Sequence, residues 1–145
     1  MKTVIGNSPE LIQKAQAIRH QVFTVEQNIP KELDLDGLDE ESVHALVTEN
    51  EALVATARLT ITAENSSVMA RVAVTKTYRG MGIASNVVRS LMEYARNHGI
   101  SSIEIHAHGY LRDYYEQFGF VFIQDVEIVG EHQLIEMHYQ FNHIT

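Results

Sequence analysis

Apolar residues recur every three or four positions in two long stretches of the chain, which is the spacing of a helix with one buried face. The first stretch begins at Ser8-Pro9-Glu10, a typical helix start, and runs to about Val22 or Phe23. The second runs from about Gly82 to Asn97. The apolar stripes are Leu11, Ala15, Ile18 and Val22 in the first stretch and Ile83, Val87, Leu91 and Ala95 in the second. The pattern therefore predicts two amphipathic helices that pack on a core.

Other segments are rich in Val, Ile, Leu and Thr and are bounded by polar or glycine-containing turns, which predicts strands. They comprise residues 44–48, 53–62, 67–74, 101–107, 120–129 and 133–141. A short helix is expected over 111–118, and residues 26–41, which contain Pro30 and Gly37, are expected to form a loop with a short helical turn. A strand, helix and strand in the middle of the chain imply a right-handed parallel crossover, with antiparallel hairpins on either side. The fold class is therefore α+β, with a mixed, mostly antiparallel twisted sheet flanked by helices.

Length and composition limit the classes of protein that come into question. With 145 residues, the chain is expected to form a single domain over residues 1–145. It contains no cysteine, which excludes disulfides, thiolate zinc sites and a thiol nucleophile. We find neither a signal peptide nor an apolar run long enough to cross a bilayer, so we expect a cytoplasmic protein with no membrane partner.

The charges are distributed unevenly along the chain. The net charge of −8 argues against a nucleic-acid partner, because phosphate groups require positive charge. Residues 31–41 hold six acids and one base, and we expect either a solvated loop or a surface that attracts a cationic amine. Residues 65–92 hold no acid and four bases, which indicates either a local anion site or chance clustering. These bases are Arg71, Lys76, Arg79 and Arg89.

The most informative segment follows the strand that ends at Val74 and leads into the long helix, with the sequence Arg79-Gly80-Met81-Gly82-Ile83-Ala84. The first amides of a helix have no partner within it, and glycines remove side chains that would keep a phosphate away. The segment therefore predicts a site for a diphosphate. It is not a P-loop, because no Lys-Ser/Thr pair follows the glycines, and Ser85 replaces the third glycine of a Rossmann loop.

Three motifs in the chain resemble those of one known family. Residues Arg79-x-x-Gly82-x-Ala84 open the long helix, and Tyr114 to Phe120 form an aromatic-Tyr-x-x-x-Gly-Phe motif. The third motif consists of Ile18-Arg19-x-x-Val22-Phe23-x-x-Glu26-Gln27, Pro30, Asp36-Gly37-x-Asp39 and His44. Together they resemble the GNAT N-acetyltransferase superfamily in its small ElaA-like branch. The chain departs from that branch at Ala70, where an acid is frequent, and at Leu134, where a histidine is frequent, so no role is carried over there.

The resemblance implies a GNAT-like acyl-CoA N-acyltransferase fold whose central parallel strand pair splays apart for the cofactor. The implied cofactor is acetyl-CoA, as the acyl donor, and the implied reaction is direct transfer of its acetyl group to a primary amine of a small molecule or peptide. The pantetheine arm would pair with the backbone of Val72 and Val74, and the diphosphate would lie on the loop amides. The residues implied in cofactor binding are Val72, Val74, Arg79, Gly80, Met81, Gly82, Ile83, Ala84 and Tyr115.

Direct transfer makes three chemical demands on the protein. The oxyanion needs a hydrogen-bond donor, for which the resemblance implies the Val74 amide. The leaving thiolate needs a general acid, for which it implies Tyr115, with the neighbouring Tyr114 as the competitor. The attacking amine must lose a proton to a base. Glu26 matches a family position on the acceptor side, and His106 titrates in the useful range, so both are candidates and Glu26 is favoured.

Two other functions compete with a transferase. A non-catalytic acyl-CoA-binding module would use the same amides and leave Tyr115 with a structural role. A metal-dependent hydrolase would use the pair His106-x-His108, whose side chains share one strand face. Its third ligand would come from His44, His132 or His138. We expect no metal site, because nothing in the sequence brings these histidines together. Dimerisation is common in the family that the chain resembles, so a homodimer is also considered, and no surface is assigned to it.

Overall fold

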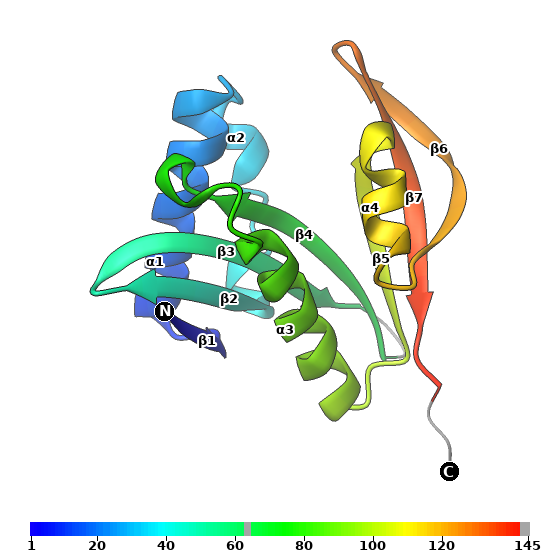
Figure 1. The fold of residues 1–145 in the computed structure, drawn as a ribbon, viewed down its shortest axis with the longest axis horizontal. Helices are drawn as coiled ribbons and strands as arrows, with labels where there is room; N and C mark the ends of the chain where they lie inside the picture. The colour runs from blue at the N-terminus through cyan, green and yellow to red at the C-terminus, as the bar shows by residue number, and fades with distance from the viewer. Residues whose placement is uncertain (63–64, 143–145) are drawn as a thin grey trace. The chain divides into compact units, whose positions relative to one another are not determined.

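The structure is a computed structural model of the chain and describes residues 1–62 and 65–142 (Figure 1). Its strands are β1 (Lys2–Gly6), β2 (Ser42–Glu49), β3 (Ala52–Ile61), β4 (Ser66–Val74), β5 (Ser102–His108), β6 (Val121–Val129) and β7 (His132–Gln140). Its α-helices are α1 (Pro9–Arg19), α2 (Lys31–Asp34), α3 (Ile83–Asn97) and α4 (Arg112–Glu116). A π-helical segment (His20–Glu26) continues α1, and 3-10 turns lie at Asp39–Glu41, Lys76–Tyr78 and Gly109–Leu111. None of the helices described here is long and apolar enough to cross a bilayer.

The strands form one hydrogen-bonded sheet in the order β1-β2-β3-β4-β5-β7-β6. The pairs β1–β2, β2–β3, β5–β7 and β6–β7 have antiparallel registers, whereas β4 and β5 are parallel. The parallel register runs from Ser66↔Ser102 to Val68↔Glu104, so Val72 and Val74 take no part in it. The mixed, mostly antiparallel α+β sheet that the sequence predicts is confirmed, including its central parallel pair.

The chain divides into two compact units. Unit 1 comprises residues 1–60 and 71–94, and unit 2 comprises the described residues of 61–70 and 95–145. Strand β4 and helix α3 therefore contribute to both units. The expectation of a single domain over the whole chain stays a prediction.

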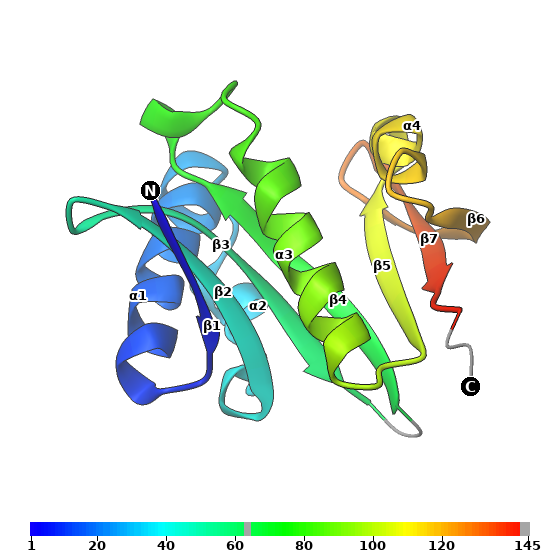
Figure 2. The same cartoon turned by 60° about the horizontal axis from the view of Figure 1, so that its bottom comes forward.

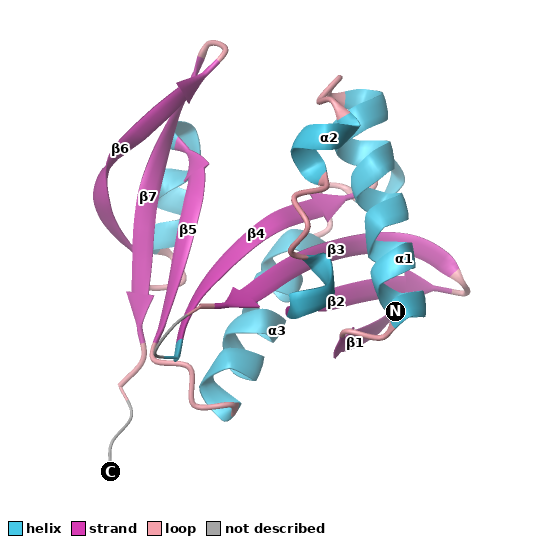
Figure 3. Ribbon diagram, turned by 180° about the vertical axis from the view of Figure 1, so that it is seen from behind, coloured by secondary structure: helices cyan, strands magenta, loops and turns pink. Residues whose placement is uncertain are grey.

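In unit 1 the strands carry helices on both faces. Figure 2 shows α3 running along these strands, and Figures 1 and 3, seen from opposite sides, show α1 and α2 on the other face. The apolar stripes predicted for both long helices are buried. Burial of one such side chain contributes about 1.5–3 kcal/mol. A core cluster thereby anchors α1 on the sheet, and it consists of Leu11, Ile18, Val22, Leu46 and Ala73.

Helix α1 begins where the sequence predicts and ends earlier. Ser8 Oγ accepts a hydrogen bond from the Leu11 amide at 3.2 Å, which caps the first turn. The α-helical segment stops at Arg19, and wider π-helical turns continue through Glu26. Such turns occur frequently at functional sites. Here they keep Val22 in the core and carry Glu26 to the end of the helical segment.

The sequence pattern does not predict strand β1. Its register with β2 runs from Lys2↔Thr48 to Gly6↔His44. The side chains of Lys2, Thr3 and Val4 are exposed, so backbone pairing rather than burial holds this strand in the sheet. A method based on apolar periodicity has no signal to detect here.

In unit 2, α4 lies on one face of β5, β7 and β6, and no described helix of this unit covers the other face (Figures 1 and 3). The Tyr115 ring of α4 contacts Phe120, which in turn contacts Tyr139 of β7. Strand residues alternate between the two faces of a sheet. The side chains of Glu136 and His138 therefore share one face of β7, and those of Met137 and Tyr139 share the face on which α4 lies. The even-numbered residues of β7 therefore occupy the face without a helix.

Candidate active site

The connection between β4 and α3 is the part of unit 1 to which the sequence assigns a diphosphate. Gly80 and Gly82 have left-handed backbones with φ of 80° and 74°, and no atom lies within 4 Å of the place where a Cβ would stand. In the described part of the chain, the amides from Gly80 to Ala84 donate to no protein acceptor. An open loop with unpaired amides at the start of a long helix fits an anion.

The last residues of β4 present one edge of their backbone away from β3. The Thr75 amide donates to the Val54 carbonyl of β3 at 2.9 Å. Successive strand residues direct their N–H and C=O groups to opposite sides, so the backbone groups of Val72 and Val74 point the other way. This edge suits pairing with an extended chain that carries its own amides.

The side chain of Arg79 joins two candidate catalytic residues. Its Nε donates to the Val74 carbonyl at 2.9 Å, and its Nη2 lies 2.8 Å from Oε2 of Glu26. The ion pair holds the Glu26 carboxylate at the end of β4. The structure thus brings together Glu26, Val74 and Arg79, which the sequence assigns to separate roles. Sequence reasoning assigns Arg79 to the cofactor alone and misses its contact with Glu26.

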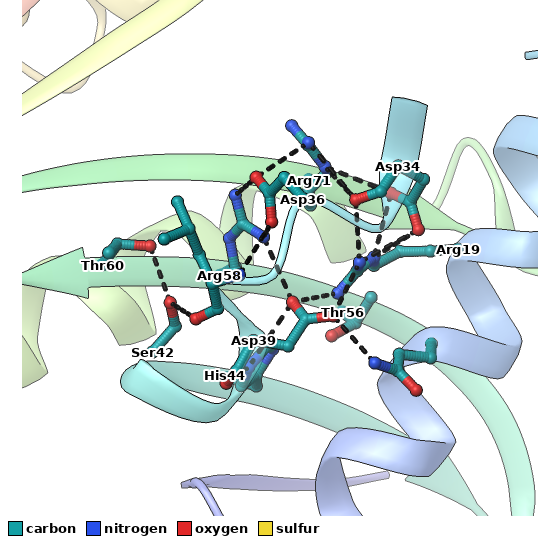
Figure 4. Close-up of polar contacts among 12 residues, drawn as sticks. Arg19, Asp34, Asp36, Asp39, Ser42, His44, Thr56, Arg58, Thr60 and Arg71 are labelled. Carbon is teal, nitrogen blue, oxygen red and sulfur yellow. Dashed lines mark hydrogen bonds and ion pairs between the residues drawn. The ribbon is translucent and has the colours of Figure 1, made fainter. Parts of the chain in front are cut away.

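A buried network of ion pairs connects α1, residues 31–41 and the strands of unit 1 (Figure 4). Arg19 is fully buried and donates to Asp34 at 3.1 Å and to Asp39 at 2.8 Å. Arg58 donates to Asp36 at 2.8 Å and to Asp39 at 3.1 Å. Because three of the acids in the segment are bonded to arginines, the segment is fixed to the body of the unit.

This network removes Asp34 and Asp39 from the expected acidic surface and Arg71 from the expected anion site, whereas the exposed Glu32, Glu40 and Glu41 leave the expectation for the acidic segment a prediction. Asp34 and Asp39 are each only 6% exposed, so they neither face solvent nor attract a cationic amine. Arg71 Nε lies 3.1 Å from Asp34, and its Nη2 lies 3.2 Å from Asp36. Its guanidinium is therefore neutralised within the protein and is not part of an open anion site.

The environment of the network shifts the pKa values of Asp36, Asp39 and His44. Burial alone would raise the pKa of the Asp39 carboxyl, but hydrogen bonds, first from Arg19, hold it far below its usual range. Burial likewise opposes ionisation of Asp36, and the bond from Arg58 prevails and lowers its pKa. Burial lowers the pKa of the His44 imidazole, whose Nε2 lies 2.9 Å from the Asp39 carbonyl oxygen. At neutral pH the network thus holds ionised aspartates and a neutral histidine.

Arg71 interrupts the regular backbone of β4. Its φ is 59°, a left-handed conformation that costs a residue with a Cβ about 1–2 kcal/mol. Its ion pairs with Asp34 and Asp36 hold the side chain while the backbone is strained. The strained residue stands directly before Val72 and thus sets the start of the open backbone edge.

Tyr115 lies on α4 in unit 2. Its side chain is buried, and its ring contacts those of Tyr114 and Phe118 as well as Phe120. Burial raises the pKa of the phenol to about 12, with a smaller contribution from Tyr114. The hydroxyl group therefore keeps its proton well above neutral pH, as a proton donor must.

The histidine pair of the sequence has separate partners in the structure. His106 Nε2 lies 2.8 Å from Glu104, whereas the His108 ring meets His132 at a centroid distance of 4.9 Å. His44 lies in unit 1, within the ion-pair network. Among the described residues, no group of potential metal ligands joins His106 and His108 with a third histidine, as a hydrolase would need.

The α+β fold is that of an acyl-CoA N-acyltransferase. A sequence profile described as "Acetyltransferase (GNAT) family" matches residues 12–120, so the chain belongs to the GNAT family and is an N-acetyltransferase. YjcF of Bacillus subtilis, named an uncharacterised N-acetyltransferase, is 28% identical over 129 residues, which cover 89% of this chain and 91% of YjcF. ElaA of Escherichia coli is 30% identical over 113 residues, which cover 75% of this chain and 74% of ElaA.

Solved structures agree with this assignment. The crystal structure of Escherichia coli ElaA has a TM-score of 0.85 and 26% identity, with 96% of this chain and 99% of that chain covered. An aminoglycoside 6'-N-acetyltransferase complexed with coenzyme A has a TM-score of 0.76 and 12% identity, with 97% of each chain covered, and is alike in fold alone. The family, fold and acyltransferase class that the sequence predicts are confirmed.

Proposed function

We propose that the protein transfers the acetyl group of acetyl-CoA to a primary amine of a small molecule or peptide by direct attack. One observation carries this proposal: an open backbone edge at Val72 and Val74 is followed by unpaired amides from Gly80 to Ala84. The edge suits the amides of a pantetheine arm, and the unpaired amides suit its diphosphate. The coenzyme A complex of the aminoglycoside acetyltransferase supports this choice of donor.

Three residues of the chain meet the chemical demands in this proposal. Acetyl-CoA supplies the thioester whose acyl carbon bonds to the amine nitrogen. The Val74 amide stabilises the negative charge that develops on the acyl oxygen, a contact worth about 3 kcal/mol. Tyr115 donates its phenolic proton to the sulfur as the C–S bond breaks. Glu26 accepts the proton that the amine must lose before attack, because an amine with a pKa near ~10 is mostly protonated at neutral pH. The second N–H proton is lost as the amide forms and passes to solvent, from which the Tyr115 phenolate is protonated again.

Glu26 is preferred to His106 as the base because of where its carboxylate is held. Glu26 and Val74 belong to the same unit, and Arg79 contacts both of them. In this proposal the Glu26 carboxylate, as proton acceptor, and the Val74 residue that supplies the oxyanion donor are therefore both held by the side chain of Arg79. Arg79 acts as a positioning residue for both.

The function is tested with a panel of amines and detection of released thiol. The panel contains polyamines, lysine peptides, aminoglycosides and amino acids. We expect acetyl-CoA-dependent thiol release with at least one primary amine and none with the N-acetylated form of the same compound. Saturable binding of acetyl-CoA without thiol release from any amine would instead favour a non-catalytic acyl-CoA-binding module.

The Gly82→Ala variant is expected to bind acetyl-CoA at least tenfold more weakly. A Cβ at φ 74° strains the loop by about 1–2 kcal/mol and stands in the open space beside the unpaired amides. Titration calorimetry with acetyl-CoA measures the effect. Gly99→Ala is the matched control, because Gly99 has φ 73° and equally open surroundings but lies beyond the end of α3. Equal losses in both variants would mean that general strain, and not the loop, weakens binding.

The Glu26→Gln variant is expected to lower kcat/KM about 10²-fold at neutral pH. Without the base, only amine that is already deprotonated reacts, so the deficit should shrink about tenfold per pH unit towards the amine pKa near ~10. A pH–rate profile of kcat/KM checks this. The His106→Gln profile is recorded beside it and should keep the shape of the wild type. If His106→Gln shows the deficit and Glu26→Gln does not, the base is His106.

A further inference from the structure

A cluster of two carboxylates and two imidazoles lies on the helix-free face of unit 2. Its members are Glu104 and His106 of β5 and Glu136 and His138 of β7. Each pair is spaced i, i+2, so both side chains of a pair project from the same face of their strand. The sequence alone does not reveal this cluster, because the register of β5 and β7 brings its two halves together.

The register places the four residues at the corners of one small rectangle. Glu104 is paired with His138, and His106 is paired with Glu136. Figure 3 shows the two strands, β5 and β7, side by side. Directly opposed residues of such strands have Cβ atoms about 4.5–5.5 Å apart. Each carboxylate therefore has one imidazole beside it on its own strand and the other imidazole opposite.

The functional atoms of Glu104, His106 and Glu136 lie together, and the imidazole of His138 adjoins both carboxylates. His106 Nε2 lies 2.8 Å from a Glu104 oxygen, and His138 Nε2 lies 3.3 Å from the other Glu104 oxygen and 2.7 Å from Oε2 of Glu136. Ligand atoms of Glu104, His106 and Glu136 all lie within 4.8 Å of one another. Around a tetrahedral ion with bonds of about 2.0–2.2 Å, ligand atoms are separated by about 3.4 Å. The spacings of 2.7, 2.8 and 3.3 Å are shorter than that value, so the side chains would move apart slightly around a bound ion.

Two contacts distinguish this cluster from a simple set of surface ion pairs. His138 Nε2 is shielded from solvent and makes no hydrogen bond of acceptable geometry, although Glu136 is so near. Gln124 of β6 donates to the other oxygen of Glu136 at 3.1 Å, which orients that carboxylate as outer partners of metal ligands do.

We infer that Glu104, His106, Glu136 and His138 form a binding site for a divalent transition-metal ion of the Zn²⁺ type. Two carboxylates neutralise the charge of the ion, and two neutral imidazoles complete four-fold coordination. Because all four ligands come from the protein, the site is structural and pins β5 to β7. The inference is independent of the proposed acetyl transfer and is an alternative to the expectation that the chain binds no metal.

The test titrates Zn²⁺ into EDTA-stripped, tag-free protein of full length by calorimetry. Co²⁺ titrated in parallel reports four-fold coordination through its visible absorption. We expect one ion per chain. Glu136→Gln and His138→Ala should each weaken binding at least tenfold, because each removes one ligand. Gln124→Ala should weaken it by about tenfold, because it frees an oriented carboxylate.

The controls separate loss of a ligand from loss of the fold. Glu136→Gln preserves the size of the side chain, and thermal unfolding in EDTA should show it folded like the wild type. His132→Ala removes an exposed histidine from the same strand and should leave the affinity unchanged. The inference is overturned if no saturable binding of one ion per chain occurs, or if folded Glu136→Gln and His138→Ala bind as tightly as the wild type. It is also overturned if His132→Ala abolishes binding, because the ion would then lie at His108 and His132.

Discussion

Replacing Tyr115 with phenylalanine is expected to lower kcat by about 10²–10⁴-fold and to leave the affinity for acetyl-CoA unchanged. The substitution removes one hydroxyl and keeps the ring that contacts Phe118 and Phe120. Since burial raises the pKa of Tyr115 to about 12, the wild-type phenol stays protonated while the acceptor amine titrates. Steady-state thiol release measures kcat, and calorimetry measures donor binding.

Tyr114→Phe is the matched control for this result. Its ring is the neighbour of Tyr115 on the same short helix, at a centroid distance of 5.1 Å, and it directs its side chain elsewhere. The kcat of this control should stay within about threefold of the wild-type value. That change is much smaller than the loss of about 10²–10⁴-fold expected when a positioned general acid is removed. If Tyr114→Phe instead abolishes turnover and Tyr115→Phe does not, the general acid is Tyr114.

The Asp39→Ala variant is expected to lose about 3–5 kcal/mol of unfolding free energy. Asp39 accepts hydrogen bonds from Arg19 and Arg58, both of which are buried, and its removal leaves their charges without a shared partner. Urea unfolding gives the midpoint and slope, and a shifted midpoint at constant slope reports stability. Asp39→Asn, which keeps the shape and loses the charge, should lie between Asp39→Ala and the wild type.

Glu40→Ala is the control for the Asp39 variants, because Glu40 is exposed in the same 3-10 turn. Its unfolding midpoint should stay near that of the wild type, and equal midpoints for Glu40→Ala and Asp39→Ala would refute a stabilising network. Acid supplies a second readout. Since the folded pKa of Asp39 is lowered, its contribution is complete above the ordinary Asp pKa of about 3.9 and is lost as the pH falls through the folded value. Asp39→Ala should therefore lose less stability than the wild type between about pH 5 and pH 3.

The elements of the fold could be predicted from the sequence where one residue pattern decides the outcome. The stripes of α1 and α3 alternate with the period of a helix, and their burial follows from it. The loop from Gly80 to Gly82 was predictable because left-handed backbones favour glycine, and the unpaired amides follow from the start of a helix. These are local properties that the chain shows within a few residues.

The contacts that the sequence could not reveal are those between distant segments. The pairing of Arg79 with Glu26 depends on the π-helical turns after α1, which no propensity signals. The acids of residues 31–41 have the composition of a solvated loop, and only the fold brings Arg19 and Arg58 to them. A charged residue in a short segment is predicted to be exposed to solvent unless its ion-pair partner is known. Here the partners, Arg19 and Arg58, lie on other elements.

The left-handed backbone of Arg71 is joined to residues 31–41 through its own side chain. Its ion pairs with Asp34 and Asp36 fix the guanidinium, whereas a glycine would adopt this backbone conformation at little cost but could make neither ion pair. One side chain thus connects the acidic segment to the point in β4 that directly precedes the open backbone groups of Val72 and Val74.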